Sequence, residues 1–256
     1  MANGAAFDDA VGALQGLPRL SVGCHVVLVD GSPVLPRSQV TSLIETQTGQ
    51  FPDQLSRVVL RAIRGQLNAG QIEAEVTAQI RKLQAVGIAV SHVDTHKHTH
   101  IFPQILRPIL KAAQACGVRA IRNPFGRLSI RLAAGNPALW KRYVQVSLLN
   151  RFAGRFRRAV ADAGMITIDG SLGVVATGAL DEELFRGVME HLPEGTWEFV
   201  CHPGYNDAEL QGVRTRLRAS REQELAALTS TSTRKYLENR GIELISYTGL
   251  AAQVSR

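Results

Sequence analysis

The sequence predicts an α/β fold in which helices wrap a mainly parallel sheet, and a barrel-like arrangement is the leading version of it. Strand-like and helix-like segments alternate along the whole chain of 256 residues. A hydrophobic content of 45% is sufficient for a substantial core. No repeat, low-complexity tract or linker divides the sequence, so we expect one domain over residues 1–256.

Three elements are expected in the first third of the chain. The apolar run at residues 20–29 is typical of a strand. Residues 54–85 have helical spacing, with Gly70 as a candidate break, and residues 87–93 form a second predicted strand.

A helix over residues 105–113 follows, with Gly117 as its natural C-terminal stop. Pro108 must kink this helix or lie in its first turn. The alternation then continues with short strands at 119–122, 173–176, 198–201 and 243–246, and with helices at 181–191, 221–227 and 231–239.

The composition argues against several classes of protein. No apolar run approaches the ~20 residues of a membrane span, and no basic residue precedes Arg19, so no signal peptide is visible. The expected location is therefore the cytoplasm. Cys24, Cys116 and Cys201 lack CxxC spacing, which argues against a disulfide framework.

The net charge of +7 is concentrated in the middle of the chain, where no acidic residue lies between Thr95 and Ala161. The basic residues of this segment are Lys97, Arg107, Lys111, Arg119, Arg122, Arg127, Arg131, Lys141, Arg142, Arg151, Arg155, Arg157 and Arg158.

Residues 139–160 combine this charge with apolar residues at helical spacing, namely Leu139, Tyr143, Val146, Leu149, Ala153, Phe156 and Val160. Such a helix suits an anionic membrane surface, which predicts a peripheral membrane contact through segment 97–158. A solvated helix packed on the core is the alternative. No nucleic-acid partner is expected, because aromatic residues are only 5% of the chain and no binding motif accompanies the charge.

Residues 92–100 read His-Val-Asp-Thr-His-Lys-His-Thr-His and hold four of the seven histidines. In a strand, successive side chains point to opposite faces, so His92, Asp94 and His96 would project together. His98 and His100 would join them while the backbone stays extended. This pattern indicates a divalent-metal or catalytic site, with a structural histidine cluster as the alternative.

Two other histidines lie in comparable places. His25 interrupts the apolar run at 20–29 and needs a partner if it is buried. His202 follows the predicted strand at 198–201, and Pro203 and Gly204 end that strand. In a parallel α/β fold, catalytic groups gather at the C-terminal ends of strands.

At these positions the chain resembles the YdjC-like carbohydrate deacetylases, and within them the branch associated with hopanoid biosynthesis. The resemblance covers roughly Leu20 to Tyr247. The segments that carry it are Gly23-Cys24-His25 with Gly31-Ser32-Pro33, the window at 92–100, Cys201-His202-Pro203, and the helix signature Arg221-Glu222-Gln223-Glu224-Leu225.

The resemblance implies a TIM-barrel-like (β/α) barrel and metal-dependent removal of an acetyl group from an N-acetylated amino sugar. It implies that His25 and His96 are metal ligands and that Asp94 and His202 line the same pocket. The cofactor implied by the family is Mg²⁺, whereas imidazole ligands suit Zn²⁺ better.

One part of the family pattern is missing. In the family a third ligand comes from an Asp-Asp-Phe-Gly motif at the end of the first strand, and this sequence has no such motif. Asp8-Asp9-Ala10-Val11 is not a substitute, because residues 6–14 have helical spacing. We therefore expect an N-terminally truncated barrel that lacks its first strand and helix, with weak metal binding and impaired activity.

Amide hydrolysis needs a base to activate water and an acid to protonate the departing amine. His202 is the predicted acid, and Asp94 is either the base or the partner that orients a ligand imidazole. His98 and His100 are predicted pocket or supporting residues, and Arg122 a predicted substrate contact. The rival functions are a non-catalytic protein that binds sugar-lipids or membrane surfaces and a metal-dependent phosphoester hydrolase.

Overall fold

The computed structural model describes residues 1–126, 137–174, 176–213 and 215–254. Two compact units make up the chain, each built from separated stretches of sequence. The first contains residues 1–122, 154–167 and those from 245 onward, and the second contains residues 123–153 and 168–244. The expectation of one domain over residues 1–256 stays a prediction beside this division.

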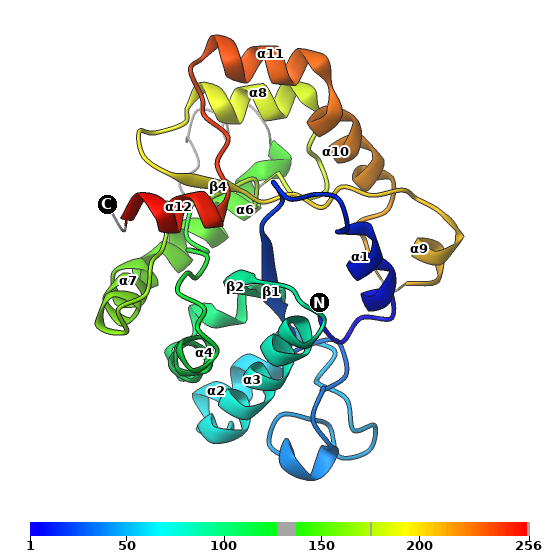
Figure 1. Ribbon diagram of the computed structural model, residues 1–256, viewed down its shortest axis with the longest axis vertical. Coiled ribbons are helices and arrows are strands. Elements are labelled where there is room, and N and C mark those ends of the chain that lie inside the picture. The colour runs from blue at the N-terminus through cyan, green and yellow to red at the C-terminus, as the bar shows by residue number, and fades with distance from the viewer. Residues whose placement is uncertain (127–136, 175, 214, 255–256) are drawn as a thin grey trace. The chain divides into compact units, whose positions relative to one another are not determined.

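The first unit is organised around parallel strands (Figure 1). Strand β1 (Val22–Val26) pairs in parallel with β2 (Val90–Thr95), so that His25 lies opposite Asp94. Parallel bridges then join Val93 to Ile121 and Ala120 to Ile166. Parallel neighbours connected through helices confirm the α/β class that the alternation predicted.

Helices cover the strands of the first unit, and α3 lies beside α4 in it (Figure 1). Val26 and Val93 of the strands have no exposed surface, and neither have Ile80 of α3 and Ile109 of α4, so these residues form the core. The helices are α1 (Phe7–Ala13), α2 (Leu55–Ile63), α3 (Ala69–Ala85), α4 (Pro103–Ala115), α7 (Ala153–Asp162) and α12 (Tyr247–Val254), with short 3₁₀ helices η1 (Arg37–Gln39) and η2 (His96–Ile101).

The second unit has its own pair of parallel strands, β3 (Gly170–Leu172) and β4 (Trp197–Phe199). Its core contains Leu172 of β3, Phe185 and Met189 of α8, and Leu237 of α11. The helices are α6 (Pro137–Leu149), η3 (Asn150–Phe152), α8 (Glu182–Glu190), α9 (Ala208–Gly212), α10 (Ala219–Thr229) and α11 (Thr231–Asn239). Helices α8 and α11 contact each other (Figure 1).

Three predicted helices are confirmed, together with the signals that begin or end them. The Asp181 side chain accepts a hydrogen bond from the Leu184 backbone and begins α8. The Ser230 hydroxyl caps α11 in the same way. Gly117, with φ of 75°, follows the end of α4, and Pro108 lies inside that helix, which continues past it.

The predicted break at Gly70 is wrong. Helix α2 ends before Gly65, whose φ of 67° is in the left-handed region. The side chain of Asn68 accepts a hydrogen bond from the Gln71 backbone and begins α3, so Gly70 lies in the first turn of that helix. The N-cap residue determines where the second helix starts. The predicted helix over 139–160 is likewise divided, into α6, η3 and α7.

The first predicted strand, at 20–29, is shorter than expected because α3 supplies a substitute partner. The strand ends at Val26, although residues 27–29 remain buried. The Gln79 side chain bonds both the N–H and the C=O of Val27, at 2.9 and 2.8 Å. The buried peptide is therefore satisfied without a neighbouring strand.

The short strands of the second half are only partly as predicted. At 119–122 only Ala120 and Ile121 form bridges, and the strand at 198–201 is instead β4. The strand predicted at 173–176 is wrong, because β3 ends at Leu172 and is followed by Gly173, where φ is 83° and a Cβ would overlap the carbonyl of Val200. Residues 243–246 are not a strand either, and Leu244 is exposed there.

The paired strands form one two-stranded sheet in each unit, so closure into a barrel stays a prediction. Among the described residues, no helix is both long enough and apolar enough to cross a membrane.

Candidate metal and catalytic site

The window at residues 92–100 changes backbone conformation halfway along. Strand β2 ends at Thr95, and the 3₁₀ helix η2 follows. Lys97 and His98 have φ of 54° and 53°, in the left-handed region that residues other than glycine rarely adopt. The expectation that the backbone stays extended as far as His100 is therefore wrong, and side-chain alternation ends at His96.

Asp94 is the buried centre of the site, with 3% of its surface exposed. Its Oδ2 accepts a hydrogen bond from Nδ1 of His25 at 2.6 Å and another from the guanidinium of Arg122. The sheet creates both contacts. Pairing of β1 with β2 places His25 opposite Asp94, and the Arg122 backbone donates to the Val93 carbonyl at 3.0 Å.

The carboxyl of Asp94 is held in its ionised form. Burial alone would raise the pKa of Asp94, but the hydrogen bond and charge of His25, with the charge of Arg122, outweigh burial. The pKa of Asp94 therefore lies well below its usual range. A carboxylate with such low proton affinity is a weak general base, so this geometry favours an orienting role for Asp94.

The hydrogen bond to Asp94 also fixes the tautomer of His25. Because Nδ1 donates to the carboxylate, Nε2 carries the lone pair whenever the ring of His25 is neutral. This Nε2 lies 3.4 Å from Nδ1 of His96. Burial, together with the charges of His25 and Lys97, lowers the pKa of His96 to about 4. His96 is then neutral at pH 7, as a metal-binding imidazole must be.

The imidazole pair fits two ligands of one metal ion. Two nitrogens that are each about 2.1 Å from a tetrahedral zinc ion are about 3.4 Å apart, which matches the separation between Nε2 of His25 and Nδ1 of His96. Within the described parts of the chain, however, no group of three or more His, Cys, Asp or Glu side chains could hold a metal. The described residues thus supply two matched ligands and not a complete set.

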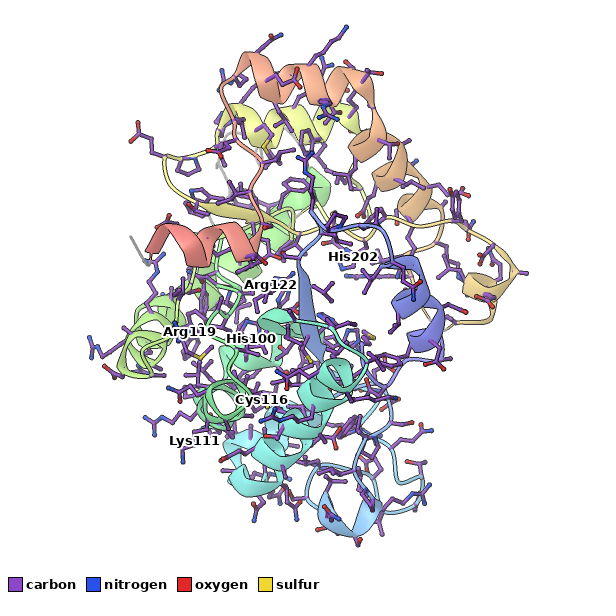
Figure 2. All side chains as sticks on the ribbon, viewed as in Figure 1. His100, Lys111, Cys116, Arg119, Arg122 and His202 are labelled. Carbon is purple, nitrogen blue, oxygen red and sulfur yellow. The ribbon has the colours of Figure 1, made fainter. Side chains whose placement is uncertain are left out.

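His100 is fully buried beneath the candidate site, with no exposed area. His100 and Arg122 lie close together (Figure 2). Nε2 of His100 contacts the carbonyl oxygen of Arg122 at 3.2 Å and must therefore carry the proton. Nδ1 then accepts from the hydroxyl of Thr95 at 2.6 Å. Burial, with the charge of His98, lowers the pKa of His100 to about 3. This environment favours the supporting role for His100 over direct contact with a substrate.

His98 and Arg122 retain partial access to solvent. The ring centroid of His98 is 6.2 Å from that of His100, and the residue is half-buried. The side chain of Arg122 is 14% exposed while it bonds Asp94. Both remain predicted substrate contacts, although Arg122 also neutralises the central carboxylate.

The side chain of His92 packs against a helix. Its ring stacks on Tyr247 of α12, with centroids 3.7 Å apart and planes 13° apart, and its Nδ1 lies 2.9 Å from the Ser91 hydroxyl. A Cβ at position 23 would overlap the His92 ring, so only glycine fits there. This contact explains the glycine two residues before His25.

His202 belongs to the second unit, in the loop after β4. Its backbone N–H donates to the carboxylate of Glu224, which lies on α10 and is 1% exposed. The other oxygen of Glu224 accepts from Gly178 at 3.4 Å.

The helix signature at residues 221–225 also holds the rest of the loop that carries His202. Gly204 donates to the carbonyl of Arg221 at 3.2 Å, and Asn206 donates to the side chain of Glu222 at 3.2 Å. The segments Cys201-His202-Pro203-Gly204 and Arg221-Glu222-Gln223-Glu224 therefore form one structural motif. His25, Asp94, His96, His98, His100 and Arg122 belong to the first unit, so a pocket shared with His202 stays a prediction.

Sequence reasoning did not identify three contributors. Thr95, inside the histidine window, bonds the ring of His100. The hydroxyl five residues before His100 was the signal in the sequence that could have indicated this contact. Asp30, which also has a left-handed φ of 56°, binds Lys97 at 2.8 Å. No local pattern marks this pair, because the two residues are 67 positions apart. The role of Glu224 in fixing the loop is visible only in the structure.

The geometry defines an α/β protein with a candidate site beside the ends of two parallel strands, where a buried carboxylate orients an imidazole pair. The chain belongs to the YdjC-like family, because the family model described as YdjC-like protein matches residues 1–239. The family expected from the sequence is thus confirmed.

Two relatives carry the name carbohydrate deacetylase. The protein of Listeria monocytogenes serotype 4a (strain HCC23) is 29% identical over 252 residues, covering 98% of this chain and 86% of the relative. The protein of Geobacillus stearothermophilus is 26% identical over 248 residues, covering 96% and 83%.

A solved structure from Enterococcus faecalis V583, described as a cellobiose-phosphate cleavage protein, superposes with a TM-score of 0.75. The two chains are 24% identical, and the match covers 98% of this chain and 85% of the other. At this identity, the likeness supports the fold and nothing further.

Proposed function

We propose that this chain is a carbohydrate deacetylase that uses a divalent metal ion to remove the N-acetyl group from an N-acetylated amino sugar. The name shared by the relatives supports the reaction. The observation that carries the proposal is the Asp94–His25–His96 arrangement, in which two imidazole nitrogens face each other at 3.4 Å.

In this proposal Nε2 of His25 and Nδ1 of His96 hold the metal ion. Imidazole ligands favour Zn²⁺, whereas resemblance to the family favours Mg²⁺. A bound ion would polarise the acetyl carbonyl and lower the pKa of a water molecule. The low pKa of His96 keeps its ring neutral and ready to bind metal at physiological pH.

Asp94 acts on the reaction through His25. Its carboxylate holds the proton on Nδ1, so that the lone pair of Nε2 points toward His96. Arg122 keeps Asp94 ionised and thereby preserves this tautomer. Asp94 and Arg122 are therefore proposed as positioning residues, and His98 as a contact for the sugar.

His202 is proposed as the acid that protonates the departing amine, because an imidazole changes charge near neutral pH. The bond from its backbone to Glu224 supports this role by fixing the loop that carries the ring. We also propose a TIM-barrel-like arrangement for the strands, on the resemblance to the family. We further propose a hopanoid-linked N-acetylglucosamine as the substrate to examine first, on the resemblance of the motif segments.

A second candidate is a non-catalytic protein that binds the same sugar-lipid. The observation that favours it is that the described residues form no group of three or more metal ligands. Such a protein would keep the pocket residues and bind the substrate without releasing acetate.

The two candidates separate in one assay of acetate release. Purified protein is incubated with an N-acetylglucosaminyl lipid and with soluble N-acetylglucosamine, after addition of Mg²⁺, Zn²⁺ or EDTA. We expect slow, metal-dependent release that is lost in His96→Ala. Substrate binding without release would favour the non-catalytic protein, and release that persists in EDTA and in His96→Ala would contradict the proposal.

A further inference from the structure

Helix α6 and the following turn η3 carry an exposed apolar stripe. Trp140, Val144, Leu148 and Phe152 are spaced four residues apart, and their exposed fractions are 49%, 50%, 57% and 39%. Residues four apart lie on the same face of a helix, so the stripe runs along α6 for about 18 Å. Among the described residues, this is the one helical segment with four large apolar side chains exposed in phase.

The stripe is distinct from the apolar face that the sequence predicted. Tyr143, Val146 and Leu149, which belong to that predicted face, are half-buried. The ring of Trp140 stacks on that of Tyr143, with centroids 5.5 Å apart and planes 21° apart. The helix thus presents apolar groups on two faces, and the face that begins with Trp140 is in water.

The segment of sequence that carries the stripe has charged residues of one sign only. Residues 137–153 contain Lys141, Arg142 and Arg151 and no acidic residue. Arg151, next to Phe152, is exposed. The wider basic segment at 97–158 has the same bias, although its Arg127 and Arg131 lie outside the described residues.

We propose that this stripe, defined as Trp140, Val144, Leu148 and Phe152, docks on an anionic lipid surface. Apolar side chains along a basic helix are the features that place a helix in the interface of a charged membrane, and tryptophan is enriched at that depth. Charge complementarity favours lipid over a second copy of the chain, because a second copy would place this basic helix against itself. The stripe narrows the predicted contact through segment 97–158 to four side chains.

The proposal does not depend on the deacetylase reaction, since none of the four side chains belongs to the candidate site. It would deepen the proposed function by giving the enzyme access to a lipid-linked sugar. Turnover of a soluble N-acetyl sugar is expected to be unchanged in stripe variants. Absence of lipid binding would therefore contradict the lipid-docking proposal alone, and absence of turnover would contradict the deacetylase proposal alone.

Vesicle flotation tests the stripe with the full chain. Vesicles of phosphatidylcholine alone are compared with vesicles of phosphatidylcholine and phosphatidylglycerol in equal parts. We expect binding to the anionic vesicles only, weakened at least about fivefold by Leu148→Glu and about fivefold by Arg151→Ala. Ile63→Glu, at a position on α2 that is 72% exposed, is the matched control and should bind as the parent does.

Tryptophan fluorescence gives a second readout at the stripe itself. The emission of Trp140 should shift to shorter wavelength with anionic vesicles, and Trp140→Phe should remove the shift because Trp197 then remains alone. Absence of binding to anionic vesicles, or unchanged binding by Leu148→Glu, would overturn the proposal. A concentration-dependent dimer that Leu148→Glu separates would also overturn it, in favour of a second copy as the occupant.

Discussion

The contacts that position the histidines differ between the two units. In the first unit, the rings of His25 and His100 bond directly to side chains or carbonyls, and these bonds fix both their orientation and their tautomer. In the second unit, the backbone N–H of His202 donates to the carboxylate of Glu224, and this bond fixes the loop.

The contacts of the first unit orient a ring, whereas the bond to Glu224 supports a loop. A metal ligand must present a lone pair in a defined direction, and a carboxylate bonded to the opposite ring nitrogen provides that. The first unit thus has the arrangement of a ligand site, and in the second unit Glu224 holds the loop of His202.

The largest expected effect comes from Asp94→Asn. This change removes a buried charge and leaves Arg122 without its counter-charge, which should lower the free energy of unfolding by about 3–5 kcal/mol. The affinity for zinc should fall about 10- to 100-fold, because the tautomer of His25 is no longer enforced. Urea unfolding and zinc titration measure the two effects, and a stable variant with parental zinc affinity would show that Asp94 does not orient His25.

Removing the carboxylate of Glu224 from the second unit should lower the free energy of unfolding somewhat less. Glu224→Ala leaves the partly buried N–H groups of His202 and Gly178 without this acceptor, and should lower the free energy of unfolding by about 1–3 kcal/mol. Zinc affinity should remain within about twofold of the parent. Glu222→Ala is the matched control, since its bond to Asn206 is exposed. Equal losses in the two variants would contradict a special role for Glu224.

The pH dependence of stability tests the buried His100. Its pKa is about 3 in the folded protein and about 6.5 when unfolded. Only the unfolded chain gains a proton on this residue as the pH falls below about 6.5. The contribution of His100 to stability is therefore complete above that pH and declines toward pH 3, by at most about 1.4 kcal/mol per pH unit. NMR titration of the ring should show no protonation between pH 7 and 5, and a midpoint near 6.5 would refute this assignment.

The smallest expected effect is at the pair between Asp30 and Lys97. The two side chains are 34% and 32% exposed, so Lys97→Met should change the free energy of unfolding by less than about 1 kcal/mol. Thermal unfolding beside Asp30→Asn, which breaks the same pair from the other side, checks this. A loss as large as that of Asp94→Asn would mean that the left-handed turn at Lys97 depends on the pair.

The residue types of the candidate site could be predicted from the sequence, because alternating histidines are rare and their chemistry is specific. Their contacts could not, because these depend on long-range pairing. The register that puts His25 opposite Asp94 joins residues 69 positions apart, and the stacking of His92 on Tyr247 depends on where the last helix packs.

Several predicted ends of strands and helices were wrong for reasons that the sequence expresses weakly. Gln79 replaces a strand partner for Val27, and the cap at Asn68 outweighs the flexibility of Gly70. Lys97 and His98 adopt left-handed backbone that no residue preference would suggest. Such positions cost free energy and often lie at functional sites, which agrees with their place directly after His96.

Zinc titration of four forms of the chain tests most directly whether His25 and His96 form one metal-binding pair. The forms are the parent, His25→Ala, His96→Ala and the control His191→Ala. His191 lies at the C-terminal end of α8, where its ring contacts the carbonyl of Gly187. The parent and His191→Ala should bind one equivalent with the same affinity, and each of the other two should bind at least about 100-fold more weakly. Parental affinity in either His25→Ala or His96→Ala would contradict the pair.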